Sequence, residues 1–331
     1  MTGVAERLLR WGLLSTAGIN RALIEPLRVS PRNELTAVAS RDPDKARTYA
    51  AEWSIPRAFG SYEAMLADPD LDVVYNPLPN GLHAEWTIKA AQAGKHILCE
   101  KPLAVSVDEV DAMAEAARRA GVVVTEAFMY RHHPQTLKIR EMVESGAIGR
   151  VQVILGSFSA HLSRPHDVRF DPALGGGSIW DLGCYPISYA RCMLGAEPIE
   201  AFGWQVTGAT GVDAVFVGQM RFASGAYAQF DSGFRSPFRA HIEIVGSEGS
   251  LRVPRPFRPG LDEHIQLARG DEVETIRMPG QELYIGEVED LADAVLLGTA
   301  PRVSLEDSRG NVAVICALLQ AARENRPVSM A

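Results

Sequence analysis

The sequence predicts an α/β protein of two domains, and three observations lead to this prediction. The chain has 331 residues, which is more than one hydrophobic core usually fills. Over the first third, short apolar runs alternate with helical patterns, as a parallel sheet with crossover helices requires. Longer apolar runs separated by glycine-containing turns follow, and these are typical of strands joined by hairpins. We place the boundary after the sixth strand, giving domains of residues 1–126 and 127–331.

The first domain is predicted to contain six strands connected by helices. The strands are the apolar runs at residues 11–14, 34–39, 58–60, 71–75, 95–99 and 122–125. Helix-favouring segments lie between them at residues 44–53, 61–66, 82–93 and 106–119. Gly94 and Gly121 stand where a glycine commonly ends a helix, and Ser106 with Glu109 is a capping box. The predicted order is therefore a repeated strand and helix.

The second domain is predicted to be rich in antiparallel sheet. A helical pattern covers residues 134–144, and strand patterns follow at 151–156, 199–206, 214–221, 226–230 and 241–245. Two further helices are predicted at 287–297 and 304–324, the latter with Ser304 as its N-cap. This pattern does not repeat the first domain.

Composition and charge exclude several classes of protein. The net charge of −8 argues against non-specific binding of nucleic acid, which requires clustered cations. No apolar run reaches the length of a membrane span, and the first residues lack the pattern of a signal peptide. The four cysteines form no C-x-x-C pair, and Cys99 and Cys316 lie in apolar stretches that are expected to be core. We therefore expect a soluble protein of the reducing cytoplasm.

The stretch His96-Ile-Leu-Cys-Glu-Lys-Pro102 is an apolar strand pattern that ends in charged residues. In an open parallel sheet the ligand crevice lies beyond the carboxyl ends of the strands, so Glu100 and Lys101 are expected beside a cofactor. Pro102 restricts the backbone of the lysine that precedes it. The alternative is an ordinary exposed turn.

A nucleotide site is expected where the first strand meets its helix, at Ser15-Thr16-Ala17-Gly18-Ile19-Asn20. The turn departs from the dinucleotide fingerprint G-x-G-x-x-G, because Ser15 and Ala17 replace its first two glycines and Asn20 the third. Small residues still let the backbone approach a diphosphate, and the helix that follows offers unpaired N–H groups. The alternative is a plain connection between strand and helix.

The end of the second strand predicts which nicotinamide cofactor is preferred. Ser40 and Arg41 stand where an acidic residue would bind the ribose hydroxyls of NAD. A hydroxyl and a guanidinium suit a 2′-phosphate, which favours NADP. The neighbouring Asp42 weakens this argument, and Arg41 could instead be a solvated charge.

The fourth strand runs into the loop Asn76-Pro77-Leu78-Pro-Asn80-Gly-Leu-His83. Two prolines make this loop rigid, so ordering it around a ligand costs little entropy. We expect it to cover the nicotinamide half of the cofactor. His83 is either part of that site or a polar residue in the first turn of a helix.

The sequence Gly175-Gly-Gly-Ser-Ile-Trp-Asp-Leu-Gly-Cys-Tyr-Pro-Ile187 places three glycines before a helical pattern. Asp181 and Tyr185 are four residues apart, so an α-helix would put both on one face. That spacing suits a pair that handles protons. The alternative is that Asp181 caps the helix and Tyr185 is a core aromatic.

The phosphate turn, the loop at 76–83 and the Glu100-Lys101-Pro102 strand end, at these separations, resemble the Gfo/Idh/MocA oxidoreductases over essentially the whole chain. The resemblance is closest to the branch of glucose–fructose oxidoreductase and dihydrodiol dehydrogenase, and closer still to the NADPH-dependent C-3 ketoreductases of deoxysugar-nucleotide biosynthesis in antibiotic pathways. It implies a Rossmann domain and a second α/β domain with a large open-faced, mainly antiparallel sheet. Such a face would expose enough apolar surface for a homo-oligomer, a dimer or a tetramer, to be expected.

The resemblance also implies an activity, namely hydride transfer from NADPH to the keto group of a nucleotide-linked sugar. Lys101 would lie beside the nicotinamide and stabilise the oxyanion, Glu100 would orient Lys101, and Asp181 would bind the substrate or Lys101. The proton donor is left open between Lys101, Tyr185 and a cofactor hydroxyl, because most of the family has a histidine where this chain has Tyr185. No metal is expected, because the histidines at 132, 133, 161 and 166 match no metal-site spacing.

The candidate site residues follow from these arguments. The expected catalytic residues are Lys101, Tyr185, Asp181 and Glu100, and the expected substrate-binding residues are Lys101, Arg131, Asp181 and Tyr185. The expected cofactor-binding residues are Ser15, Thr16, Ala17, Gly18, Ile19, Asn20, Ser40, Arg41, Asn76, Pro77, Leu78, Asn80, His83, Glu100, Lys101 and Trp180. Two other functions stay open: a dehydrogenase of a free sugar, inositol or trans-dihydrodiol, and a non-catalytic NADP-binding sensor. The sensor has no need of the acidic and basic groups at 100, 101, 181 and 185.

Overall fold

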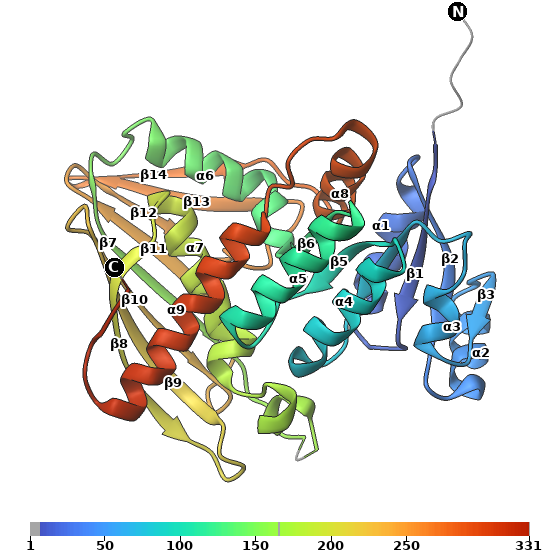
Figure 1. Cartoon of the computed structure of the whole chain (residues 1–331). Coiled ribbons are helices and arrows are strands. Elements are labelled where there is room, and N and C mark those ends of the chain that lie inside the picture. Colours follow the sequence, from blue (N-terminus) through green and yellow to red (C-terminus); the bar gives the residue numbers. More distant parts are fainter. Residues whose placement is uncertain (1–6, 165, 331) are drawn as a thin grey trace, which may run out of the picture. The chain divides into compact units, whose positions relative to one another are not determined.

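A computed structural model describes residues 7–164 and 166–330 of the chain (Figure 1). The chain divides into two compact units. The first contains residues up to 132 together with 284–308, and the second contains 133–283 and the residues from 309 onward. The first unit therefore includes a segment, 284–308, that the sequence division at 126 assigned to the second domain. The physical reason is helix α8, Ile285–Leu297, whose Val288 and Leu291 are part of the hydrophobic core of the first unit.

The first unit is built on a parallel sheet of six strands in the order β3-β2-β1-β4-β5-β6, which is the order of a dinucleotide-binding Rossmann fold. Its strands are β1 Leu9–Leu14, β2 Asn33–Ala39, β3 Arg57–Phe59, β4 Val73–Asn76, β5 His96–Glu100 and β6 Val124–Ala127. Its connecting helices are α1 Asn20–Val29, α2 Pro43–Glu52, α3 Tyr62–Leu66, α4 His83–Gln92 and α5 Val107–Ala120. All six predicted strands and all four predicted helices are confirmed to within about two residues at each end.

Local signals at the helix ends also hold. The Ser106 hydroxyl accepts a hydrogen bond from the Glu109 amide at the start of α5, and Gly121 ends that helix with a φ of 67°. Gly94, with a φ of 73°, follows α4. Positive φ costs glycine little, so these positions stop the helices and return the chain to the sheet.

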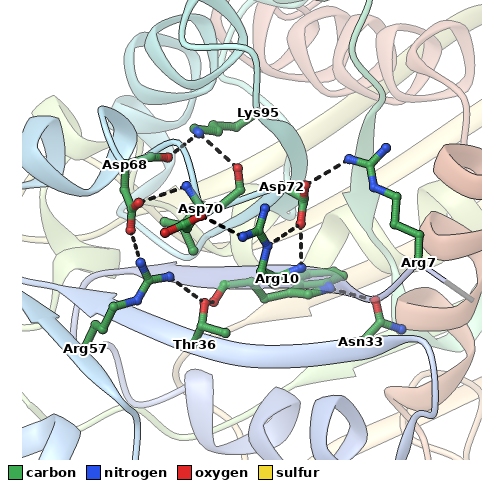
Figure 2. Close-up of polar contacts among 11 residues, drawn as sticks. Arg7, Arg10, Asn33, Thr36, Arg57, Asp68, Asp70, Asp72 and Lys95 are labelled. Carbon is green, nitrogen blue, oxygen red and sulfur yellow. Dashed lines mark hydrogen bonds and ion pairs between the residues drawn. The ribbon is translucent and has the colours of Figure 1, made fainter. Parts of the chain in front are cut away.

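A network of charged side chains connects the starts of the strands at one end of this sheet (Figure 2). The Asp72 carboxylate accepts hydrogen bonds from the Arg10 amide and guanidinium, at 2.9 and 3.1 Å. Lys95 donates to the backbone oxygens of Asp68 and Leu71. Although burial opposes the effect, the hydrogen bonds from Arg10 and Arg7 hold the pKa of Asp72 below its usual value. These contacts stabilise the end of the sheet at which the strands begin, which lies opposite the strand ends at which a Rossmann fold binds its ligand.

The second unit is built on a mixed sheet of nine strands in the order β14-β13-β12-β11-β7-β10-β9-β8-β15 (Figure 1). Only the pair β7 and β10 is parallel. The strands are β7 Val151–Ser159, β8 Pro198–Thr207, β9 Asp213–Phe222, β10 Tyr227–Gly233, β11 Arg239–Gly246, β12 Ser250–Val253, β13 Glu263–Arg269, β14 Glu272–Met278 and β15 Val328–Ser329. Helices α6 Pro134–Glu144, α7 Cys184–Leu194 and α9 Leu305–Glu324 complete the described regular helices, and the predicted N-cap Ser304 accepts from the Asp307 amide. The mainly antiparallel sheet is as expected.

The two faces of this sheet differ in burial. Helix α7 packs on β7 and β10, and on this face residues such as Phe216, Phe230 and Ile244 are buried. On the other face Trp204 of β8 lies beside Val217 of β9, and their exposed fractions are 53% and 44%. This exposed apolar surface is the open face that the family resemblance implied.

Two sequence-based expectations in this unit need correction. Strands β12 to β15 were not predicted, because they are short or carry polar residues at most exposed positions, as in Glu272–Met278. Cys316, expected in the core, is only half-buried, whereas Cys99 is buried. No helix in the described part of the chain is long and apolar enough to cross a membrane.

Candidate functional site

The turn after β1 has the conformation of a phosphate-binding turn. Ser15 has a φ of 111°, and its amide lies within hydrogen-bond distance of the backbone oxygens of Leu13 and Ala39. The Asn20 side chain donates to the Ser15 oxygen at 2.8 Å, which holds the turn against the first residue of α1. The start of α1 has no side-chain cap, so its N–H groups fit an anion. Thr16, Ala17, Gly18 and Ile19 are at least partly exposed here.

The Ser40 and Arg41 pair lies beside this turn. Leu14 of β1 and Ala39 of β2 are paired in the parallel register, so the residues that follow them emerge together. Arg41 is exposed, and the Ser40 hydroxyl accepts from the Asp42 amide. The Asp42 carboxylate accepts from the amides of Asp44 and Lys45 and so caps α2. Because Asp42 has this structural role, a hydroxyl and a cation are the groups that this strand end offers a ribose.

The loop after β4 is held from inside by two of its predicted site residues. Asn76 is fully buried, and its side chain donates to the His83 oxygen and to Thr87 and accepts from the Leu78 amide. His83 is also fully buried, with its two ring nitrogens 2.6 and 2.8 Å from the backbone oxygens of Leu78 and Pro102. Burial lowers the pKa of His83 to about 4, so the ring is neutral at pH 7. Both side chains shape the loop, and their contact with a cofactor stays a prediction.

Asn80 is better placed than Pro77 and Leu78 to meet a ligand at this loop. Asn80 begins a short 3-10 helix, Asn80–Leu82, and is only partly buried, whereas Pro77 and Leu78 are buried. Asn76 pairs with Cys99 across β4 and β5, so the loop emerges next to Glu100.

The strand end of β5 carries Glu100 and Lys101, both partly exposed. The Tyr75 hydroxyl donates to Glu100 at 2.5 Å, and the Lys101 amide lies 3.3 Å from the other oxygen of the same carboxylate. Tyr75 is fully buried, and burial together with the Glu100 charge raises its pKa well above the usual value. The phenol therefore stays protonated as a donor. Tyr75 was missed in the sequence, where it reads as an ordinary apolar strand residue.

In the second unit, the glycine-rich segment is shaped by close backbone approaches. A Cβ on Gly176 would lie 2.6 Å from the Arg169 oxygen, and one on Gly177 would lie 2.2 Å from the Asp213 carboxylate. Gly177 also has a φ of 126°. Asp213, almost fully buried, accepts from the Ser178 hydroxyl at 2.6 Å and from the Ile179 amide at 2.9 Å. These contacts fix the start of the helical segment that carries Asp181.

That segment is not the regular α-helix that the spacing predicted. Residues Ile179–Gly183 form a π-helical turn, and α7 begins only at Cys184. The assumption of one α-helical face for Asp181 and Tyr185 is therefore wrong. Trp180, within the same turn, is buried.

Asp181 and Tyr185 have different surroundings. Asp181 forms an ion pair with Arg169 at 2.7 Å, and Arg169 also contacts Asp167. These carboxylates raise the pKa of Arg169 further above its usual value, so it is permanently charged. The Tyr185 ring packs edge-on against Phe158 with centroids 5.1 Å apart. Arg169 was missed in the sequence, because it lies in an irregular stretch where no spacing points to it.

The remaining predicted residue, Arg131, is buried in the first unit. Its guanidinium forms an ion pair with Asp307 at 2.9 Å. This partner limits its freedom to bind a substrate, and its predicted role stays untested. Within the described ranges, no group of three or more His, Cys, Asp or Glu side chains is arranged to hold a metal ion.

Comparison with known proteins places this geometry in a family. Residues 9–128 match the family described as an oxidoreductase family with an NAD-binding Rossmann fold, and residues 136–252 match the GFO/IDH/MocA C-terminal domain. The chain belongs to the GFO/IDH/MocA oxidoreductase family. The family membership implied by the sequence motifs is thereby confirmed, and the phosphate turn, the uncapped helix and the charged strand end fit its nicotinamide dinucleotide cofactor.

Two relatives and one solved structure illustrate the range of the family. D-xylose 1-dehydrogenase (NADP(+)) 2 of Haloferax volcanii is 39% identical over 97% of this chain and 100% of that protein. The dTDP-3,4-didehydro-2,6-dideoxy-alpha-D-glucose 3-reductase of Actinomadura kijaniata is 33% identical over 96% of both chains. The crystal structure of KijD10, a 3-ketoreductase of the same organism in complex with NADP and TDP-benzene, matches with a TM-score of 0.89 and 31% identity over 95% of this chain and 98% of KijD10. The GFO/IDH/MocA chain described here is therefore an oxidoreductase.

Proposed function

We propose that this oxidoreductase uses NADPH to reduce a keto group, at C-3, of a nucleotide-linked deoxysugar. The observation that carries the proposal is the strand end of β5, where Tyr75 fixes Glu100 directly before Lys101. The similarity over 96% of the chain to a dTDP-sugar 3-reductase supports the substrate class. A role in antibiotic biosynthesis follows from the same similarity and is part of the proposal.

The preference for NADPH rests on the strand end of β2. Arg41 is exposed and Ser40 follows the residue paired with the last residue of β1, so both are suited to a 2′-phosphate. The acidic candidate, Asp42, is occupied as the N-cap of α2.

In the proposed mechanism the cofactor supplies the hydride and the side chains supply charge and protons. The Lys101 ammonium stabilises the oxygen of the carbonyl as negative charge develops on it. Glu100, held by Tyr75, orients the lysine. Asp181, oriented by Arg169, accepts hydrogen bonds from sugar hydroxyls. The proton for the product comes from Lys101, from the Tyr185 phenol or from a hydroxyl of the cofactor.

A second candidate function is the NADP-dependent oxidation of a free sugar. It is favoured by the 39% identity to a D-xylose 1-dehydrogenase over nearly the whole chain. A relative described as a trans-1,2-dihydrobenzene-1,2-diol dehydrogenase, 35% identical over 74% of the chain, supports a diol in the same way.

One panel of assays separates these functions. NADPH oxidation is measured with dTDP-linked 3-keto sugars and with free keto sugars and diketones, and NADP reduction is measured with xylose and with a trans-dihydrodiol. A kcat/KM at least about a hundredfold higher for the nucleotide-linked ketone supports the proposal. Higher kcat/KM for xylose or the dihydrodiol would replace it with the second candidate.

We also propose that the protein forms a homo-oligomer through the open face of the nine-stranded sheet. Trp204, Val217 and Tyr227, from three adjacent strands, have exposed fractions of 53%, 44% and 47%. Trp204 pairs with Val217 of β9, and Tyr227 pairs with Arg221 of the same strand. Val217 and Arg221 are four residues apart on β9, so all these side chains lie on the same face of the sheet. Monomers rarely expose an apolar patch of this kind.

A further inference from the structure

The second unit contains a cavity of about 430 Å³, within the range of volumes that small-molecule sites occupy. Asp181 and Arg169 form part of its wall, together with Phe158, Phe238, Arg164 and Arg258. The cavity is therefore next to the side chains to which the proposed function assigns the sugar.

The charges in this wall do not cancel. Three arginines, 164, 169 and 258, face two aspartates, 167 and 181. Both carboxylates form ion pairs with Arg169. Arg164 and Arg258 are exposed, and neither has an ion-pair partner within the described ranges of the chain. Two guanidinium groups beside a concave surface suit an anion with several oxygens, above all a phosphate.

The cavity also has an aromatic side. Phe238 has an exposed fraction of 62%, and its ring stands edge-on to Phe158 with centroids 6.2 Å apart. An exposed phenyl group beside cations offers a flat surface on which a heteroaromatic base can stack. Phe158 in turn contacts the Tyr185 ring, so the aromatic side is continuous with the proposed proton donor.

We propose that this cavity binds the nucleoside diphosphate part of the substrate, with the phosphates on Arg164 and Arg258 and the base on Phe238. A free pentose needs neither two unpaired cations nor an exposed ring, so the wall selects for a nucleotide-linked sugar. This inference rests on the proposed ketoreductase function and assigns the residues that determine its substrate class.

The test is calorimetric titration of thymidine diphosphate into protein saturated with NADP, so that the phosphate turn after β1 is already filled. The expected result is saturable binding that weakens as salt is added. Arg164→Met and Arg258→Met should each raise the Kd at least about tenfold. Arg140→Met is the matched control, because Arg140 is a half-exposed arginine of α6 in the same unit and outside the cavity. The Kd of thymidine diphosphate for this variant should equal that for the parent.

The base and the phosphates are separated by a second titration with inorganic diphosphate. Phe238→Ala should raise the Kd of thymidine diphosphate about fivefold or more and leave the Kd of inorganic diphosphate unchanged. Failure of thymidine diphosphate to bind the NADP-saturated protein, or an equal Kd in the parent and both arginine variants, would overturn the inference. An unchanged affinity of Phe238→Ala for thymidine diphosphate would overturn the assignment of the base.

These outcomes are distinct from those that test the proposed function, because binding needs no turnover. If thymidine diphosphate binds as expected but no keto sugar is reduced, the cavity stands and the ketoreductase proposal fails. If a free sugar is turned over with the same KM in the parent and the arginine variants, and thymidine diphosphate does not bind, the cavity inference fails and the oxidoreductase remains.

Discussion

Asp213 allows a quantitative prediction, because it is buried and holds the segment that carries Asp181. Its carboxylate accepts hydrogen bonds from the Ser178 hydroxyl and the Ile179 amide. Burial outweighs these hydrogen bonds and raises the pKa of Asp213 from 3.8 to about 6. The folded protein therefore retains a proton that the unfolded chain releases between these two values.

The sign of the effect on stability follows from this difference. A raised pKa in the folded state contributes stability that is fully present below pH 3.8 and is lost as the pH rises through about 6. A shift of about two pKa units corresponds to roughly 3 kcal/mol of unfolding free energy, and a value of about 2–3 kcal/mol is expected because some charge is still solvated. Asp213→Asn removes the titrating group. The unfolding free energy of the variant, relative to the parent, should therefore increase by about 2–3 kcal/mol between pH 4 and pH 7.

The measurement is chemical denaturation of parent and variant at a series of pH values across this window. Asp271→Asn, in the exposed turn between β13 and β14, is the matched control and should follow the parent profile at every pH. Profiles of Asp213→Asn and the parent that run parallel from pH 4 to pH 7 would refute the reasoning, because they would mean that Asp213 titrates alike in the folded and unfolded chain.

Four further predictions concern the cofactor, the chemistry, the loop and the assembly. Arg41→Ala should reduce the difference in binding free energy between NADPH and NADH, calculated from their Kd values, by about 1–3 kcal/mol. A parent protein that binds both cofactors equally well would contradict the assignment. Lys101→Ala should lower kcat by a factor of about 10²–10⁴ and leave the affinity for NADPH nearly unchanged. In single-turnover assays, Tyr185→Phe should lower the rate as much as Lys101→Ala only if the phenol is the sole proton donor. His83→Phe should lower the unfolding free energy by about 1–3 kcal/mol, since a buried carbonyl loses its donor, and equal stability would exclude that role for the imidazole. Trp204→Glu should shift the mass found by light scattering from an oligomer to the 36.0 kDa monomer, and a parent that is already monomeric would contradict the proposed interface.

Much of the fold could be predicted from the sequence where burial is nearly complete. Strands β1 and β4 in the middle of the first sheet are buried over nearly all their residues, because helices cover both faces of a parallel sheet. Strands β13 and β14 were missed because one of their faces is exposed and polar, which leaves only alternate apolar residues in a charged segment. Helix α8 was predicted, but its membership of the first unit was not, because its packing against α1, far earlier in the chain, has no signature in the sequence.

The candidate site shows the same limit at the level of side chains. Glu100, Lys101 and Asp181 could be proposed because strand ends and glycine-rich turns are visible locally. Their partners could not. Tyr75 is 25 residues from Glu100 and Arg169 is 12 residues from Asp181, and no local pattern links either pair.

A motif also does not reveal whether its members meet a ligand or hold the loop that does. Asn76 and His83 bracket one rigid loop and look alike in the sequence, as polar residues at a strand end. Both are fully buried and make hydrogen bonds to backbone groups or neighbouring side chains, whereas Asn80 between them is partly exposed. The difference has a physical cause: the two prolines of this loop have no backbone N–H group, so hydrogen bonds from side chains must hold the loop in place. Substitution of His83 should therefore disturb the loop as a whole, whereas substitution of Asn80 should change only contacts made at its surface.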